Sequence, residues 1–165
     1  MCTGVRFADA AGNLYFGRNL DWCESYGEGV VITPRGASIP TQFLGSLSPE
    51  HACVGMGIVV GGVPCYFDCA NEAGLAIAGL NFPGYAQFAE APEKGAVNVA
   101  AYEFPLWVAA SFSTVAEVRK ALKDVVIVAK APSEGYGVAQ LHWLVGDGKE
   151  SIVIECQADG MHVYD

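Results

Sequence analysis

Basic residues are few in this 165-residue sequence, and they do not cluster. Nine Lys and Arg stand against 18 Asp and Glu, which gives a formal net charge of −9 and an isoelectric point near 4.6. Binding to a phosphate backbone requires a basic patch or stripe, which these scattered positions do not supply. The sequence therefore predicts no nucleic-acid partner.

Metal-ligand motifs are also lacking. The six cysteines form no C-x-x-C pair, and only three histidines accompany them. Zinc sites in proteins are usually built from such pairs, or from closely spaced Cys and His residues. We therefore expect no metal site.

Long apolar runs are missing as well. No apolar stretch is long and uncharged enough to predict a membrane span. Arg6 and Asp9 interrupt the start of the chain, which argues against a secretory signal. We expect a cytoplasmic protein with no membrane partner, in which the thiols stay reduced.

What the sequence does contain is enough apolar material for a large core, since 52% of residues are hydrophobic and 16% are charged. Two helices are predicted. The first covers 98–110, with Pro105 expected to kink or restart it, and the second covers 115–123, with Thr114 and Glu117 as a capping box. Glycine-containing turns predict mainly antiparallel strands. The fold class is therefore α+β, antiparallel sheets covered by helices, with strands at 2–8, 14–20, 29–34, 54–60, 63–69, 75–80, 125–129, 138–146, 151–156 and 161–164.

The second residue carries the main chemical signal. Removal of Met1 would leave Cys2 with both a thiol and a free α-amino group. A thiol has an ordinary pKa of ~8.5 and an α-amine one of roughly 7.7 to 8, so the amine can accept the thiol's proton near neutral pH. Nucleophile and base then share one residue, as in N-terminal threonine hydrolases. This arrangement favours acyl transfer, although a second-position Cys is most often an inert small hydrophobe.

A hairpin is predicted around Cys2. Two strand-like runs flank a turn centred on Ala11 and Gly12, so that cross-strand partners have numbers summing to 23. This register places Cys2 opposite Asp21, with Arg18 nearby. A carboxylate there can orient the α-ammonium, and a guanidinium can favour the thiolate. Without Cys2, the same charges would be read as a solvated ion pair at the end of a hairpin.

The order of several motifs resembles the choloylglycine hydrolase family, which contains bile salt hydrolases and penicillin V acylases. The resemblance covers nearly the whole chain. The motifs that carry it are Cys2-Thr3-Gly4, Gly12-Asn13-Leu14, Gly17-Arg18-Asn19-Leu20-Asp21-Trp22, Val30-Val31-Ile32-Thr33-Pro34-Arg35-Gly36, Asn71-Glu72-Ala73-Gly74-Leu75, Ala78-Gly79-Leu80-Asn81-Phe82 and Tyr102-Glu103-Phe104-Pro105-Leu106-Trp107.

The resemblance implies a bacterial N-terminal-nucleophile hydrolase with a four-layer αββα fold, in which residues 1–165 are the N-terminal portion of one domain. It implies that Cys2 attacks the amide bond of glycine- or taurine-conjugated bile salts, with Arg18, Asp21 and Asn81 as further catalytic residues. It also implies no cofactor, and a homotetramer for the full-length protein. Asn81 favours the bile salt branch, because the penicillin-preferring branch often has tyrosine there. Taken alone, Asn81 also fits a turn residue that closes a strand.

The loops 23–28, 59–65 and 125–140 are expected to line an apolar pocket. An anionic steroid would not be attracted by the net charge of the protein, so an apolar pocket or a local Arg must hold it. Tyrosine suits such a ligand because its ring is apolar and its tip polar, but the tyrosines here also fit ordinary half-buried loop residues. The predicted substrate-binding residues are Leu20, Tyr26, Val59, Cys65 and Tyr136.

One departure from the family stands out. Family chains continue for about as long again, and their second half carries two more active-site residues, an asparagine and an arginine. We therefore expect residues 1–165 to be a fragment with an incomplete site, and to belong to a longer enzyme. Two alternatives stay open: a penicillin V acylase, and a non-catalytic bile-acid-binding fragment.

Overall fold

A β-hairpin begins the computed structural model, which describes residues 2–165. Strands β1 (Thr3–Ala8) and β2 (Leu14–Asn19) pair antiparallel. The Asp9 carboxylate closes their turn by accepting hydrogen bonds from the backbone N–H groups of Ala11 and Asn13. Gly4 lies opposite Arg18, so partner numbers sum to 22 and not to the predicted 23. The predicted register, in which Arg18 would face Val5 and Cys2 would face Asp21, is therefore wrong by one residue.

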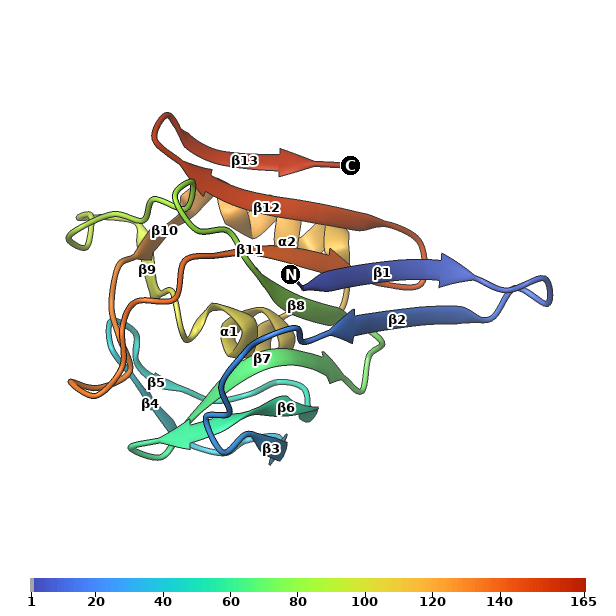
Figure 1. The fold of residues 1–165 in the computed structure, drawn as a ribbon, viewed down its shortest axis with the longest axis horizontal. Helices are drawn as coiled ribbons and strands as arrows, with labels where there is room; N and C mark the ends of the chain where they lie inside the picture. The colour runs from blue at the N-terminus through green and yellow to red at the C-terminus, as the bar shows by residue number, and fades with distance from the viewer. Residues whose placement is uncertain (1) are drawn as a thin grey trace.

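A seven-stranded antiparallel sheet forms the centre of the molecule (Figure 1). The predicted strands of this sheet are confirmed to within a few residues. Its strands, in spatial order, are β13 (Gly160–Tyr164), β12 (Ser151–Gln157), β11 (Leu141–Gly146), β8 (Ala76–Asn81), β7 (Val63–Asn71), β6 (Cys53–Val60) and β3 (Gly29–Thr33).

Three short strands were not predicted. β4 (Ile39–Thr41) and β5 (Gly45–Leu47) form a small antiparallel hairpin, with Pro40 inside the first strand. β9 (Val97–Ala100) pairs with β10 (Val125–Val128), and this pair is parallel. A parallel pair needs a crossover connection, which the two helices between β9 and β10 provide.

The first helix begins later than predicted. α1 covers Phe104–Ser111, and residues 98–100 of the predicted helix 98–110 belong to strand β9 (Val97–Ala100). The β-branched Val97 and Val99 suit a strand, and Pro105 lies in the first turn of the helix, where its missing N–H is no loss. α2 (Val115–Ala121) has the predicted capping box of Thr114 and Glu117, and a 3₁₀ turn (Leu122–Asp124) follows it.

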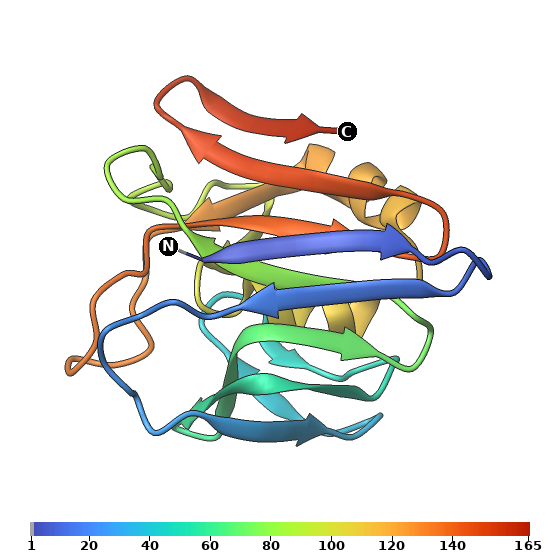
Figure 2. The same cartoon turned by 45° about the vertical axis from the view of Figure 1, so that its right-hand side comes forward.

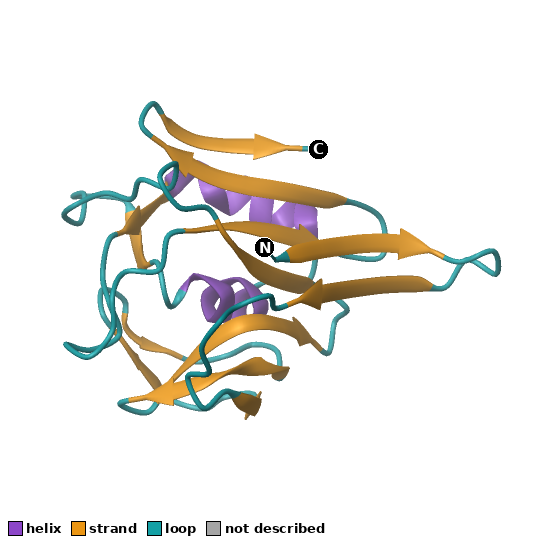
Figure 3. Ribbon diagram, viewed as in Figure 1, coloured by secondary structure: helices purple, strands orange, loops and turns teal. Residues whose placement is uncertain are grey.

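The elements stack in layers (Figure 2). Both helices lie against one face of the large sheet, and the β1–β2 hairpin lies across the other (Figure 3). The helix-side core contains the fully buried Ile77 and Trp143 from the sheet and Phe104 from α1. On the hairpin side the approach is close, because a Cβ at Gly4 would lie 3.1 Å from Leu144 Cδ2. The hairpin therefore rests directly on β8 and β11, which brings Cys2 to the sheet.

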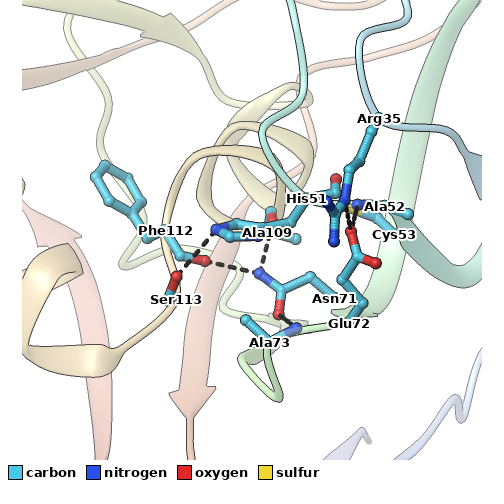
Figure 4. Close-up of polar contacts among 10 residues, drawn as sticks. All are labelled: Arg35, His51, Ala52, Cys53, Asn71, Glu72, Ala73, Ala109, Phe112 and Ser113. Carbon is cyan, nitrogen blue, oxygen red and sulfur yellow. Dashed lines mark hydrogen bonds and ion pairs between the residues drawn. The ribbon is translucent and has the colours of Figure 1, made fainter.

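A polar cluster ties the end of β7 to the end of α1 (Figure 4). The buried Asn71 side chain donates to the carbonyl oxygens of Ala109 (2.8 Å) and Phe112 (2.7 Å). Its oxygen accepts hydrogen bonds from the N–H groups of Ala73 and Leu75, both at 3.0 Å. One side chain thus fixes the β7–β8 turn and the C-terminus of α1 together.

Candidate active site

The observed hairpin register places Cys2 and Arg18 on the same face. Arg18 lies opposite Gly4, and Cys2 is two residues before Gly4, so alternation along the strand directs both side chains to one side. The predicted register would have placed them on opposite faces, because a shift of one residue reverses every side chain. In the structure Arg18 Nη2 is 3.9 Å from Cys2 Sγ.

The Arg18 guanidinium is almost entirely enclosed, with 7% of its side chain exposed. Its Nη2 donates a hydrogen bond to the carbonyl oxygen of Gly79 at 3.0 Å, on the same side as Cys2. Its Nη1 lies 3.7 Å from the Asp68 carboxylate on β7. A buried cation requires such partners, since removal from water without compensation is costly. Strands β2, β7 and β8 together therefore set the position of the positive charge beside the thiol.

Cys2 opens into a cleft of about 480 Å³ with mainly apolar walls. Tyr26 forms one wall, with its ring 6.0 Å from that of Phe67 and 6.5 Å from that of Tyr136. The segment around 132–141 forms another wall. A cleft of this size and lining suits a largely apolar ligand with a few polar groups.

The cleft brings together most residues predicted from the sequence. Cys2, Arg18 and Asn81 line it among the predicted catalytic residues, and Asn81 is the last residue of β8. Asp21, just beyond β2, and Val59, at the exposed end of β6, do not line it. Ile58 does so in place of its neighbour Val59. The predicted substrate-binding residues that line the cleft are Leu20, Tyr26, Cys65 and Tyr136.

Cys65 is a poor candidate for a second nucleophile, although it lines the cleft. Burial raises the pKa of its thiol to about 11. The thiolate is the reactive form, so Cys65 is neutral at physiological pH and contributes an apolar surface. Its place in the cleft is compatible with contact to a substrate but not with attack on one.

Sequence reasoning missed several residues of the site. Asp68 and the carbonyl group of Gly79 hold Arg18, and Trp22, Phe67 and Tyr102 line the cleft. Asp68 did leave a signal, since it is the one charged residue within the apolar run of β7. Gly79 acts through its backbone, and no side-chain pattern reveals such a role.

Two negative findings apply to the described part of the chain. Residues 2–165 contain no group of three or more His, Cys, Asp or Glu placed to hold a metal ion. In the same residues, no helix has the length and apolar character needed to cross a membrane.

Comparison with known sequences gives bacterial relatives. The bile salt hydrolase/transferase of Bifidobacterium longum subsp. longum is 56% identical over 165 residues, which are 99% of this chain and 52% of that protein. The conjugated bile acid hydrolase of Lactobacillus gasseri is 52% identical over 166 residues, covering all of this chain and 52% of that protein. The chain thus spans about half the length of the curated relatives it matches.

Comparison with solved structures gives the same family of folds. The C2A mutant of the conjugated bile acid hydrolase from Clostridium perfringens matches with a TM-score of 0.95 and 36% identity, over all of this chain and 51% of that one. Penicillin V acylase from Agrobacterium tumefaciens matches with a TM-score of 0.74 and 19% identity, over 99% of this chain and 49% of that one. The predicted α+β fold of N-terminal-nucleophile hydrolases is confirmed.

The family described as linear amide C-N hydrolases, choloylglycine hydrolase family, matches residues 2–165. That match leaves out only Met1. Together with the two relatives above 50% identity, it confirms the resemblance seen in the motifs. The chain belongs to the choloylglycine hydrolase family of linear amide C-N hydrolases.

Proposed function

We propose that the protein carrying this chain hydrolyses the amide bond of glycine- or taurine-conjugated bile salts, with Cys2 as its nucleophile. The observation that carries the proposal is the position of Cys2 Sγ, which lies at an apolar cleft and 3.9 Å from a buried guanidinium. The names of the relatives support the substrate class, since those proteins are a bile salt hydrolase/transferase and a conjugated bile acid hydrolase.

The nucleophile requires a base. Loss of Met1, which lies outside the described residues, would place an α-amine on Cys2 itself. That amine accepts the thiol proton, and Arg18 stabilises the resulting thiolate by its charge. The thiolate then attacks the amide carbonyl carbon.

The reaction then follows the usual two steps of covalent catalysis. The C–N bond breaks, the α-ammonium returns its proton to the leaving glycine or taurine, and the acyl group remains on sulfur as a thioester. The amine next takes a proton from a water molecule, whose oxygen attacks the thioester carbonyl carbon. The C–S bond breaks, the free bile acid leaves, and the proton returns to the Cys2 sulfur. Asn81 ends β8 and lines the same cleft as Cys2, and we expect its side chain to donate a hydrogen bond to the carbonyl oxygen as it becomes negative.

Amino-acid release from glycocholate, measured on the protein at its natural full length under reducing conditions, tests the proposal. We expect Cys2→Ser, and a variant with a tag left in front of Cys2, to lose at least ~10³-fold in kcat while unfolding at the same urea concentration. Substantial turnover by either variant would refute the mechanism. A wild-type protein that binds cholate but releases no glycine would instead favour the non-catalytic alternative.

The acyl preference is tested in parallel. Asn81 in place of tyrosine favours bile salts, so we expect cholyl amides to be turned over faster than phenoxyacetyl amides. The reverse order would assign the protein as a penicillin V acylase. The homotetramer, the cytoplasmic location and the assignment of residues 1–165 to one domain stay predictions.

A further inference from the structure

We propose that Asp68 is a positioning residue that holds Arg18 against Cys2. The effect of Asp68 on catalysis rests on the proposed function, whereas its contact with Arg18 does not. Asp68 does not line the large cleft, so it has no contact with a substrate bound there. It acts on the nucleophile through the guanidinium.

The first step of the argument is the burial of Arg18. With 7% of its side chain exposed, this guanidinium retains little contact with water. Arginine stays charged at any physiological pH, so the charge cannot be removed by a change of protonation. It therefore needs a nearby negative group in order to remain in this position.

The second step is the set of contacts that each guanidinium nitrogen makes. Nη2 faces Gly79 O and Cys2 Sγ, and Nη1 faces Asp68 Oδ2 at 3.7 Å. Nε is buried and has no hydrogen-bond partner among residues 2–165. Asp68 is thus a carboxylate paired with Arg18, through Nη1 and not through the Nη2 that faces the thiol. Its attraction fixes the rotation of the guanidinium and so the distance from Nη2 to sulfur.

The third step is the surroundings of the pair. A cavity of about 170 Å³ between the hairpin and the sheet is lined by Arg18, Asp68 and the apolar Phe16, Val54 and Ala76. Burial raises the pKa of Asp68, and Arg18 opposes that rise. Without Asp68, Nη2 would still reach Gly79 O, but the guanidinium would have space to turn toward this cavity.

The test compares Asp68→Asn, which keeps the shape but removes the charge, with Asp68→Glu, which keeps the charge. The matched control is Glu72→Gln, which breaks the ion pair between Arg35 and Glu72, neither of which lines the cleft. We expect Asp68→Asn to lower kcat for glycocholate and the rate of Cys2 alkylation by iodoacetamide at pH 7 by roughly tenfold, with KM nearly unchanged. Asp68→Glu should keep most of the wild-type value of both rates, and Glu72→Gln should leave both rates at the wild-type value.

A double-mutant cycle tests the route through Arg18. In an Arg18→Leu background, Asp68→Asn should change Cys2 alkylation by less than about twofold. An equal effect in both backgrounds would overturn the proposal, as would wild-type rates in Asp68→Asn or a failure of Asp68→Glu to restore them. Alkylation needs no substrate. A wild-type protein that is alkylated at Cys2 but inactive on glycocholate would therefore contradict the proposed function, while the alkylation rates of the Asp68 variants would still decide the role of Asp68.

Discussion

Four of the six cysteines are buried, and burial raises their pKa. The value is about 11 for Cys53 and Cys65 and about 12 for Cys156, and for Cys69 it lies well above the ordinary value. In the folded chain, access and thiolate formation therefore both disfavour reaction at these positions. Cys2 is partly exposed and Cys23 is exposed.

This contrast predicts selective alkylation of the native protein. At pH 8, iodoacetamide should modify Cys2 and Cys23 at least ~10-fold faster than the four buried cysteines, because the buried cysteines are inaccessible and have small thiolate fractions. Peptide mass spectrometry over a time course measures the rates. In concentrated urea the six rates should converge, which serves as the control. Native-state alkylation of Cys65 as fast as that of Cys23 would contradict the buried state of the cleft wall.

At the level of elements, alternation and glycine turns predicted most of the large sheet. These patterns failed where a strand was very short, and where the residues of a strand also fitted a neighbouring helix. The hairpin of β4 and β5 has three residues in each strand. Residues 98–100 were assigned to a helix, although the valines of Val97–Ala100 favour a strand. The hairpin register was wrong by one residue, because the sequence alone does not determine which residue centres the turn. That single residue decides whether Arg18 faces Cys2.

The site was predictable to the extent that it depends on local sequence. Cys2, Arg18 and Asn81 occur in recognisable motifs, and the structure brings them to one cleft. Val59 was chosen by its place in a loop, and the alternation of β6 directs its neighbour Ile58 to the cleft instead. Asp68 meets Arg18 only through the packing of the hairpin on β7, a tertiary contact that no local pattern contains.

The link between the β7–β8 turn and α1 can be broken at one atom. Asn71→Asp keeps the acceptor for the N–H groups of Ala73 and Leu75, but it places an oxygen against the carbonyl groups of Ala109 and Phe112. We expect a loss of about 2 to 4 kcal/mol in the free energy of unfolding, because buried acceptors then face one another. Urea denaturation measures it.

Asn98→Asp is the matched control for this change. Asn98 also donates to two carbonyl groups, those of Glu93 and Ala96, and accepts from the N–H of Glu93, but two of these three contacts are exposed. Water can compensate there, so the expected cost is below about 1 kcal/mol. Equal costs for the two variants would show that burial of Asn71 does not determine its contribution.

Across the whole molecule, two carboxyl groups respond to pH in opposite directions. The exposed Glu72 carboxylate accepts hydrogen bonds from the Arg35 side chain and from the Ala52 N–H, which lower its pKa to about 2. Burial raises the pKa of Glu103, which is 2% exposed and accepts a hydrogen bond from the Gln42 N–H. Glu72 therefore stabilises the fold above its unfolded-state pKa of ~4.3, and this contribution falls as the pH drops toward 2. Glu103 stabilises it only while protonated, so its contribution is lost as the pH rises through its folded-state pKa.

Urea denaturation of Glu72→Gln and Glu103→Gln from pH 3 to pH 8 separates these effects. The advantage of the wild type over Glu72→Gln should grow as the pH rises from 3 to 5, because ionised Glu72 then holds Arg35. The advantage of the wild type over Glu103→Gln should shrink as the pH rises further, because Gln keeps the acceptor for the Gln42 N–H and carries no buried charge. Slopes of the same sign in the two comparisons would mean that Glu103 is as well solvated or paired as Glu72, and that burial at the start of α1 does not control its charge.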